Sequence, residues 1–439
     1  MKKKYRIILY TSIFLLCVVA SIILVVKKSN SVYEEESKPK VVKHKSMLSM
    51  NLEQTAGSGD YKTVTQSSWP TEGYKFNAEL SKCENGSTLS WDDTKKAVIM
   101  QGNVSDKCYV YFDIWIPSIA DYCTSGTDLA TCVKNFGDQG PSVSNIYIHN
   151  SSLTNGAGDN SYRYAGANPN NFVCFGSDAS PCPIDNLYRI IGVFGENYHG
   201  ANGKQLVKLI KYDYMTTDEL GTDGDYSQTY KEWGMDSTYK GTYGDGERIG
   251  VYYWNYKATG SATNTWSTSL LNKTNLNTNF INNIGTTWAN KIATVTWKVG
   301  GNTWANIGTK TSSVAYTNEI TNPVTTNTTD NATTYSAKIG LMYVSDYGFA
   351  ASPDAWTLTM SSYNNTTATN NNWMYMGLYE WTISRRAGDS DDAFGVGGDG
   401  DVYDYIVGYD FGVRASFNLE SSVSYVSGSG SMSDPIVIN

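Results

Sequence analysis

Residues 381–419, WTISRRAGDSDDAFGVGGDGDVYDYIVGYDFGVRASFNL, decide the fold of this chain. Short apolar segments alternate in this stretch with runs of aspartate and glycine, which are common turn residues for backbone reasons. The pattern predicts short strands joined by exposed loops. Tyr403, Tyr405 and Tyr409 fall inside these loops, where ligand binding and loop packing explain them equally well.

Aspartates crowd the same stretch, at Asp389, Asp391, Asp392, Asp399, Asp401, Asp404 and Asp410. Carboxylates on flexible loops suit calcium, for which Asp389, Asp391 and Asp392 are the candidate ligands. The EF-hand spacing is absent, because Ala393 occupies the fifth position. Solvated turn aspartates are therefore favoured, and we predict no cofactor, with calcium as the alternative. A hydrolase pairing Glu380 with one of these aspartates is a further alternative, but we predict no catalytic residue.

The aromatic content gives a second indication of function. The chain has 33 tyrosines and 12 tryptophans among many Asn, Ser, Thr and Gly residues, a combination typical of adaptable binding surfaces. Alternation in NWMYMGLYEW, residues 372–381, favours a strand with core tryptophans. Arg414 is a candidate ligand clamp, although a role in holding loops through carboxylates or carbonyls is favoured. The predicted ligand-binding residues are Tyr403, Tyr405, Tyr409, Asp399, Asp401, Asp404 and Arg414.

The amino terminus predicts a membrane anchor. Twenty uncharged residues from Ile7 to Val26 lie between two basic clusters, and in a helix they would rise ~30 Å. The larger basic cluster precedes the span, so we expect a single-pass protein of the cell membrane with a cytoplasmic amino terminus and an extracellular bulk. A cleaved signal peptide is less favoured. Without the six basic residues of the anchor, 28 Lys and Arg face 42 Asp and Glu, which disfavours nucleic-acid binding.

The cysteines outside the anchor predict disulfides, because their number is even. Sequence cannot choose rigorously among the possible pairings, but local sequential pairing is favoured. A bridge between the second pair requires a helix break at Ser125 and Gly126, with Thr127 or Asp128 capping a new helix. Zinc is disfavoured because no CxxC pair occurs. The favoured pairs are Cys83 with Cys108, Cys123 with Cys132, and Cys174 with Cys182.

Hydrophobic patterning divides the chain into five parts. Alternation from Cys108 to Ile114 predicts a strand, and LYRIIGVF with QLVKLIKYD predicts a hairpin. Fourfold spacing of Leu276, Phe280 and Ile284 predicts an amphipathic helix, and the Thr- and Asn-rich residues 309–334 predict a long loop. The expected parts are a transmembrane signal anchor (1–28), a flexible stalk (29–60), a small β-sandwich spacer (61–117), a helical connector (118–145) and a head domain (146–439).

A family resemblance covers about residues 174–439. NLYRIIGVF with VKLIKYD, TWSTSLLN with FINNIG, KIGLMYVSDYGFAASPDAW, and WTISRR with FGVR follow one another in an order that resembles a domain of unknown function common in surface proteins of gut Gram-positive bacteria. That family is distantly similar to the C-type-lectin-like and formylglycine-generating-enzyme-like fold. The resemblance implies a C-type-lectin-like head. Together with the parts expected from the earlier residues, the predicted fold class is α+β: a C-type-lectin-like head preceded by a small disulfide-stapled β-sandwich module and an N-terminal transmembrane helix.

The departures from the wider fold group limit what the resemblance implies. No cysteine follows Cys182, only three histidines occur, and the EPN, QPD and WND motifs of sugar-binding C-type lectins are missing. The enzymatic and calcium-dependent activities of that group therefore do not carry over. We predict a surface protein, not an enzyme, that recognises or adheres to a glycan or protein ligand. A structural component of the cell envelope and a paired-carboxylate hydrolase are the alternatives.

Overall fold

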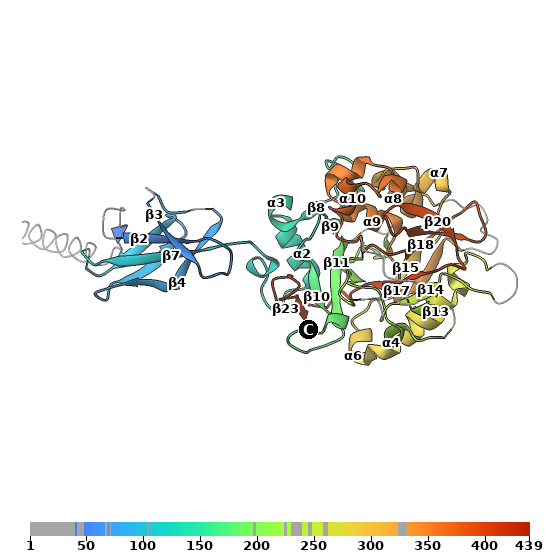
Figure 1. Cartoon of the computed structure of the whole chain (residues 1–439), viewed down its shortest axis with the longest axis horizontal. Coiled ribbons are helices and arrows are strands. Elements are labelled where there is room, and N and C mark those ends of the chain that lie inside the picture. Colours follow the sequence, from blue (N-terminus) through green and yellow to red (C-terminus); the bar gives the residue numbers. More distant parts are fainter. Residues whose placement is uncertain are drawn as a thin grey trace, which may run out of the picture. The chain divides into compact units, whose positions relative to one another are not determined.

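The computed structural model describes residues 40–41, 48–65, 68–70, 72–103, 105–195, 199–223, 226–229, 239–244, 248–257, 262–323 and 332–439, with only the backbone of 40–41 and 226–229. Contacts divide the chain into two compact units, of which the first ends at Ile116 and the second spans Pro117–Asn439 (Figure 1). Each unit has its own buried core.

The first unit consists of two small sheets. One has the strand order β3-β2-β7-β4 and the other β1-β6-β5. Their core includes Met50, Val98 and Phe112, to which both sheets contribute. The strands are β1 (Lys40–Val41), β2 (Leu48–Glu53), β3 (Tyr61–Val64), β4 (Tyr74–Cys83), β5 (Thr88–Asp92), β6 (Ala97–Gln101) and β7 (Cys108–Ile114).

Residues 48–53 were predicted to be part of a flexible stalk, but they are a regular strand. They form β2, which pairs with β3 on one side and runs parallel to β7 on the other. Met50 and Leu52 are buried between neighbours, so this segment belongs to the core of the first unit. Burial in β7 follows the predicted alternation, with Cys108, Val110 and Phe112 inside.

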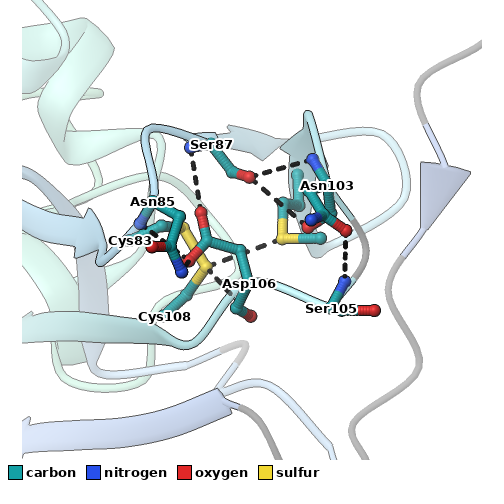
Figure 2. Close-up of a disulfide and its surroundings, with 8 residues drawn as sticks. Cys83, Asn85, Ser87, Asn103, Ser105, Asp106 and Cys108 are labelled. Carbon is teal, nitrogen blue, oxygen red and sulfur yellow. Dashed lines mark hydrogen bonds between the residues drawn. A yellow bond between two sulfur atoms is a disulfide. The ribbon is translucent and has the colours of Figure 1, made fainter.

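The three disulfides confirm the sequential pairing. Cys83 and Cys108 lie directly opposite each other on β4 and β7. In the neighbouring turn the Asp106 carboxylate accepts hydrogen bonds from the backbone N–H groups of Asn85 and Ser87 (Figure 2). A helix begins at Leu129 with the Asp128 side chain as its cap, as the second pair requires. Disulfides are typical of oxidising compartments such as the cell exterior.

Two larger sheets form the frame of the second unit. A seven-stranded sheet has the order β17-β22-β12-β11-β9-β8, with β10 also on β11, and a six-stranded sheet has the order β13-β14-β21-β18-β19-β20. The first comprises β8 (Ile146–Ile148), β9 (Tyr162–Tyr164), β10 (Phe172–Cys174), β11 (Leu187–Phe194), β12 (Leu206–Lys211), β17 (Ile339–Gly340) and β22 (Ser416–Asn418). The second comprises β13 (Tyr226–Thr229), β14 (Gly250–Tyr253), β18 (Glu380–Arg385), β19 (Asp392–Val396), β20 (Val402–Ile406) and β21 (Asp410–Gly412).

Short helices and two strand pairs complete the second unit (Figure 1). The pairs are β15 (Val295–Lys298) with β16 (Thr334–Ala337) and β23 (Tyr425–Ser427) with β24 (Val437–Ile438). The helical elements are η1 (Ile119–Asp121), α2 (Leu129–Gly137), α3 (Pro141–Ser144), η2 (Ile184–Asn186), α4 (Thr217–Leu220), η5 (Trp266–Thr268), η6 (Leu271–Phe280), α5 (Ile281–Asn283), α6 (Gly285–Ala289), α7 (Trp304–Ile307), α8 (Ser312–Tyr316), η7 (Thr317–Thr321), α9 (Val344–Ala350), η8 (Pro353–Thr357), η9 (Met360–Ser362) and α10 (Thr366–Thr369).

Local predictions hold better here than long-range ones. The β11–β12 hairpin and the helical segment around Leu276 and Phe280 are confirmed. Residues 118–145 were predicted to be a helical connector, but Leu129 and Val133 of this segment lie in the core of the second unit. The loop predicted at 309–334 contains α8, η7 and the start of β16.

The predicted fold class is wrong. We expected an α+β chain with a C-type-lectin-like head, a β-sandwich module and an N-terminal transmembrane helix, whereas the described residues form a mixed α/β structure dominated by sheets. Their longest single helical element, the π-helix η6, has 10 residues, about half the roughly 20 that a membrane-spanning helix needs. No helix among the described residues is long and apolar enough to cross a membrane. The predicted span from Ile7 to Val26 lies outside the described residues.

Candidate functional site

The hairpin β19–β20 positions two of the predicted tyrosines. Tyr403 pairs with Gly395 and Tyr405 with Ala393 across the hairpin. Side chains two residues apart point to the same face of a strand, so both rings lie on one face of the six-stranded sheet. A Cβ at Gly395 would approach the rings of Tyr405 and Phe411 to 3.2 and 3.4 Å. The glycine therefore lets the aromatic rings lie directly on the sheet.

The tyrosines gather around Phe411 on that face. The ring of Phe411 has its centre 5.0 Å from Tyr379, 4.9 Å from Tyr405 and 6.2 Å from Tyr409. Tyr403 lies 5.8 Å from Tyr405. We call Tyr379, Tyr403, Tyr405 and Tyr409 the tyrosine platform. Phe411 is buried, but Tyr379, Tyr403 and Tyr409 are 42%, 46% and 48% exposed, so a large aromatic area faces solvent.

Two aspartates lie beside the tyrosine platform, in the turn between β19 and β20. Burial and the neighbouring charge of Asp399 raise the pKa of Asp401 to about 7. Both carboxylates also help to raise the pKa of the Tyr405 hydroxyl, after the larger effect of its burial. The surface therefore combines aromatic rings with acidic hydrogen-bond acceptors and carries negative charge.

The other predicted aspartates form ion pairs or hydrogen bonds. The Nη1 atom of Arg386 lies 2.9 Å from an Asp392 carboxylate oxygen and 3.6 Å from one of Asp389, and it also binds Asp404. The neighbouring carboxyl group of Asp389 raises the pKa of Asp391. Asp404 thus helps to fix the hairpin. Among the described residues no group of three or more histidine, cysteine, aspartate or glutamate side chains is placed to hold a metal ion.

Arg414 does not reach the surface. Its Nε donates to Glu380 Oε1 at 2.8 Å and its Nη2 to Glu380 Oε2 at 2.9 Å. A further bond runs from Nη2 to the Met374 carbonyl at 2.6 Å. Arg414 is 1% exposed and Glu380 2%. Arg414 therefore ties β18 to the segment after β21. This is the structural role that the sequence favoured, and its place among the predicted ligand-binding residues is corrected.

Sequence reasoning missed Phe411 as a part of this surface and left the role of Tyr379 open. The strand predicted over residues 372–381 is wrong for most of its length, because only Glu380 and Trp381 lie in a strand, β18. Trp373 and Trp381 are buried as expected. Fold and surface define a disulfide-bonded, sheet-rich protein of two compact units with an exposed aromatic face. A comparison with known protein families, curated proteins and solved structures finds no match to this chain. The surface is therefore interpreted from its own chemistry.

Proposed function

We propose that this protein acts outside the cell and recognises a neutral glycan through the tyrosine platform. The observation that carries the proposal is the cluster of exposed tyrosines around Phe411. Contiguous exposed aromatic surface of this kind is typical of interaction sites. The disulfides support an extracellular location, and attachment to the cell membrane through residues 7–26 is part of the proposal.

The chemistry of the tyrosine platform favours a sugar. Tyrosine rings offer a rigid apolar face for the C–H groups of a pyranose, and their hydroxyls can bond to sugar hydroxyls. Asp399 and Asp401 add acceptors for sugar O–H groups. The same carboxylates repel anionic ligands, which favours an uncharged glycan.

The test is a glycan screen with the full chain, purified in a sugar-free detergent. Tyr403→Ala and Tyr409→Ala should each weaken binding roughly two- to twelvefold, because an aromatic contact contributes about 0.5–1.5 kcal/mol. Tyr109→Ala is the matched control, since Tyr109 is a half-exposed tyrosine of the first unit. Unchanged binding by both platform variants would refute the site assignment.

Two further arms of the screen address the alternatives. Loss of binding on chelation would add a calcium ion to the site, with Asp389, Asp391 and Asp392 as the ligands to replace next. Shortening of the bound glycan would indicate a paired-carboxylate hydrolase. If no glycan on the array binds, recognition of a protein ligand or a structural role in the cell envelope would be favoured over glycan recognition.

A further inference from the structure

A second candidate site lies in a cavity of about 250 Å³ in the second unit. Its walls include the aromatic side chains Phe172, Tyr212, Trp373 and Tyr375, together with four asparagines and two methionines. None of the tyrosine platform's residues lines it. Arg189 and Lys240 also line the cavity, and none of its described lining residues carries a carboxylate. A site with two cations is unexpected on a chain with a net charge of −8.

Arg189 is a buried cation to which the described residues supply no counter-charge. Its guanidinium carbon lies 4.4 Å from the ring centre of Phe172 and 4.6 Å from that of Trp373. Its Nε donates to the Asn171 amide oxygen at 2.7 Å, and Nη2 donates to the Pro169 carbonyl at 2.9 Å. All the bonds that it makes run to neutral oxygens, and in the described part of the chain no carboxylate forms an ion pair with it.

This arrangement is costly without an anion. Arg189 is 4% exposed, and burial, with a smaller repulsion from Arg414, lowers its pKa to about 9. Burying a cation away from water is unfavourable unless an opposite charge or strong hydrogen bonds compensate. The rings and neutral oxygens hold the guanidinium in place but leave its charge unneutralised. An anion inside the cavity would supply that compensation.

Lys240 provides a second cation at the same cavity. Its ammonium group donates to the Thr369 carbonyl at 2.8 Å and lies 4.4 Å from the ring centre of Tyr375. An ammonium group has three N–H donors, so one bond to Thr369 leaves donors for a ligand. Lys240 is an exposed residue at the cavity, and partial burial of its ammonium group lowers its pKa. No carboxylate among the described residues forms an ion pair with it.

We propose that this cavity binds the carboxylate-bearing ring of an acidic sugar, at a site separate from the tyrosine platform. The carboxylate lies near Arg189 and Lys240, and the sugar ring packs against the aromatic wall. Exposed Asn168 and Asn170 on the rim carry amides that can both donate to and accept from sugar hydroxyls. The volume is below the roughly 300–1,000 Å³ of sites for drug-sized ligands, which suits a single ring.

The test measures binding of glucuronate and glucose to the full chain by saturation-transfer NMR. The two sugars share a ring and differ by one carboxylate. Glucuronate should bind at least roughly tenfold more tightly, and Lys240→Gln should weaken it by a similar factor, because a hydrogen bond to a charged group is lost. Lys240→Arg should keep most of the affinity. Lys257→Gln is the control, since Lys257 is exposed and does not line the cavity.

Each other outcome overturns the proposal. Equal binding of glucose and glucuronate would show that the cavity does not recognise the carboxylate. Full affinity for glucuronate in Lys240→Gln would show the same for Lys240. N-acetylglycine or inorganic phosphate bound as tightly as glucuronate would refute a sugar ligand. No binding of glucuronate at millimolar concentration would refute the site. The variants Tyr403→Ala and Tyr409→Ala should bind glucuronate normally. A result that refutes glycan binding by the tyrosine platform can therefore be told apart from one that refutes acidic-sugar binding in the cavity.

Discussion

Replacing Arg414 by methionine tests the ion pair that anchors β18. The substitution removes two charged hydrogen bonds to Glu380 and one to the Met374 carbonyl, while Glu380 stays 2% exposed. Breaking a buried pair by removing one partner costs about 3–5 kcal/mol, chiefly because the other charge is stranded. We expect a loss of that size in the free energy of unfolding at pH 7.5.

The loss of stability in Arg414→Met should depend on pH, and the pKa of Glu380 gives the direction of that dependence. Burial raises the pKa of Glu380 even beside Arg414, and loss of the guanidinium must raise it further. A carboxyl with a raised folded-state pKa destabilises the fold as pH rises through that value. The deficit of Arg414→Met should therefore grow with pH and shrink toward pH 4–5, near the roughly 4.3 of an unfolded glutamate.

The assay is urea unfolding at pH 5 and pH 7.5, with disulfides intact. The double variant Glu380→Leu with Arg414→Met removes both charges and should recover much of the loss. A cost below about 1 kcal/mol, or a double variant no more stable than the single one, would show that the pair does not hold the sheet as described.

Three further predictions concern other groups. Replacing Cys83 and Cys108 by serine should destabilise the first unit by about 3–4 kcal/mol in the chain-entropy model, seen as faster amide exchange in β7; unchanged exchange would contradict it. Burial holds the pKa of His149 well below its usual value, so stability should fall as pH drops below about 6.5. His149→Asn, which keeps a hydrogen-bond acceptor, should flatten that slope by up to about 1.4 kcal/mol per pH unit in denaturation series. The pKa of Asp401 is raised to about 7 beside Asp399, so Asp401→Asn should stabilise the protein at pH 8 and not at pH 4; a gain equal at both would refute the shift.

The elements that could be predicted from the sequence are those formed by residues close to one another along the chain. The β11–β12 hairpin and the Cys174–Cys182 bridge join residues a short distance apart, and their patterns are local. Strand β2 was missed because its parallel partner β7 lies about 60 residues further along the chain. Helix α8 was missed because its Thr- and Asn-rich surroundings resemble a loop, whereas Ala315 and Tyr316 are buried by tertiary packing.

The candidate site was predictable to a similar extent. Aspartate and glycine content predicted loops at Tyr403 and Tyr405, whereas the structure places both in strand β20, on one face of a hairpin. The role of Arg414 depends on Glu380, 34 residues away, and no local pattern pairs them. Arg189 was not singled out, because its lack of a counter-charge becomes visible only when the surrounding side chains are placed.

The parallel pairing of β2 with β7 has a mechanical consequence. Leu48 pairs with Cys108 and Leu52 with Phe112, so the start of β2 and the end of β7 lie at opposite ends of the pair. Tension between a tether before β2 and a ligand held by the second unit would slide the two strands past each other, stretching all their hydrogen bonds at once instead of opening them one by one. The Cys83–Cys108 bond would also keep the loop that it closes from extending. We expect the first unit to resist pulling in this direction, and single-molecule stretching that opens it at a force typical of strand peeling would refute this.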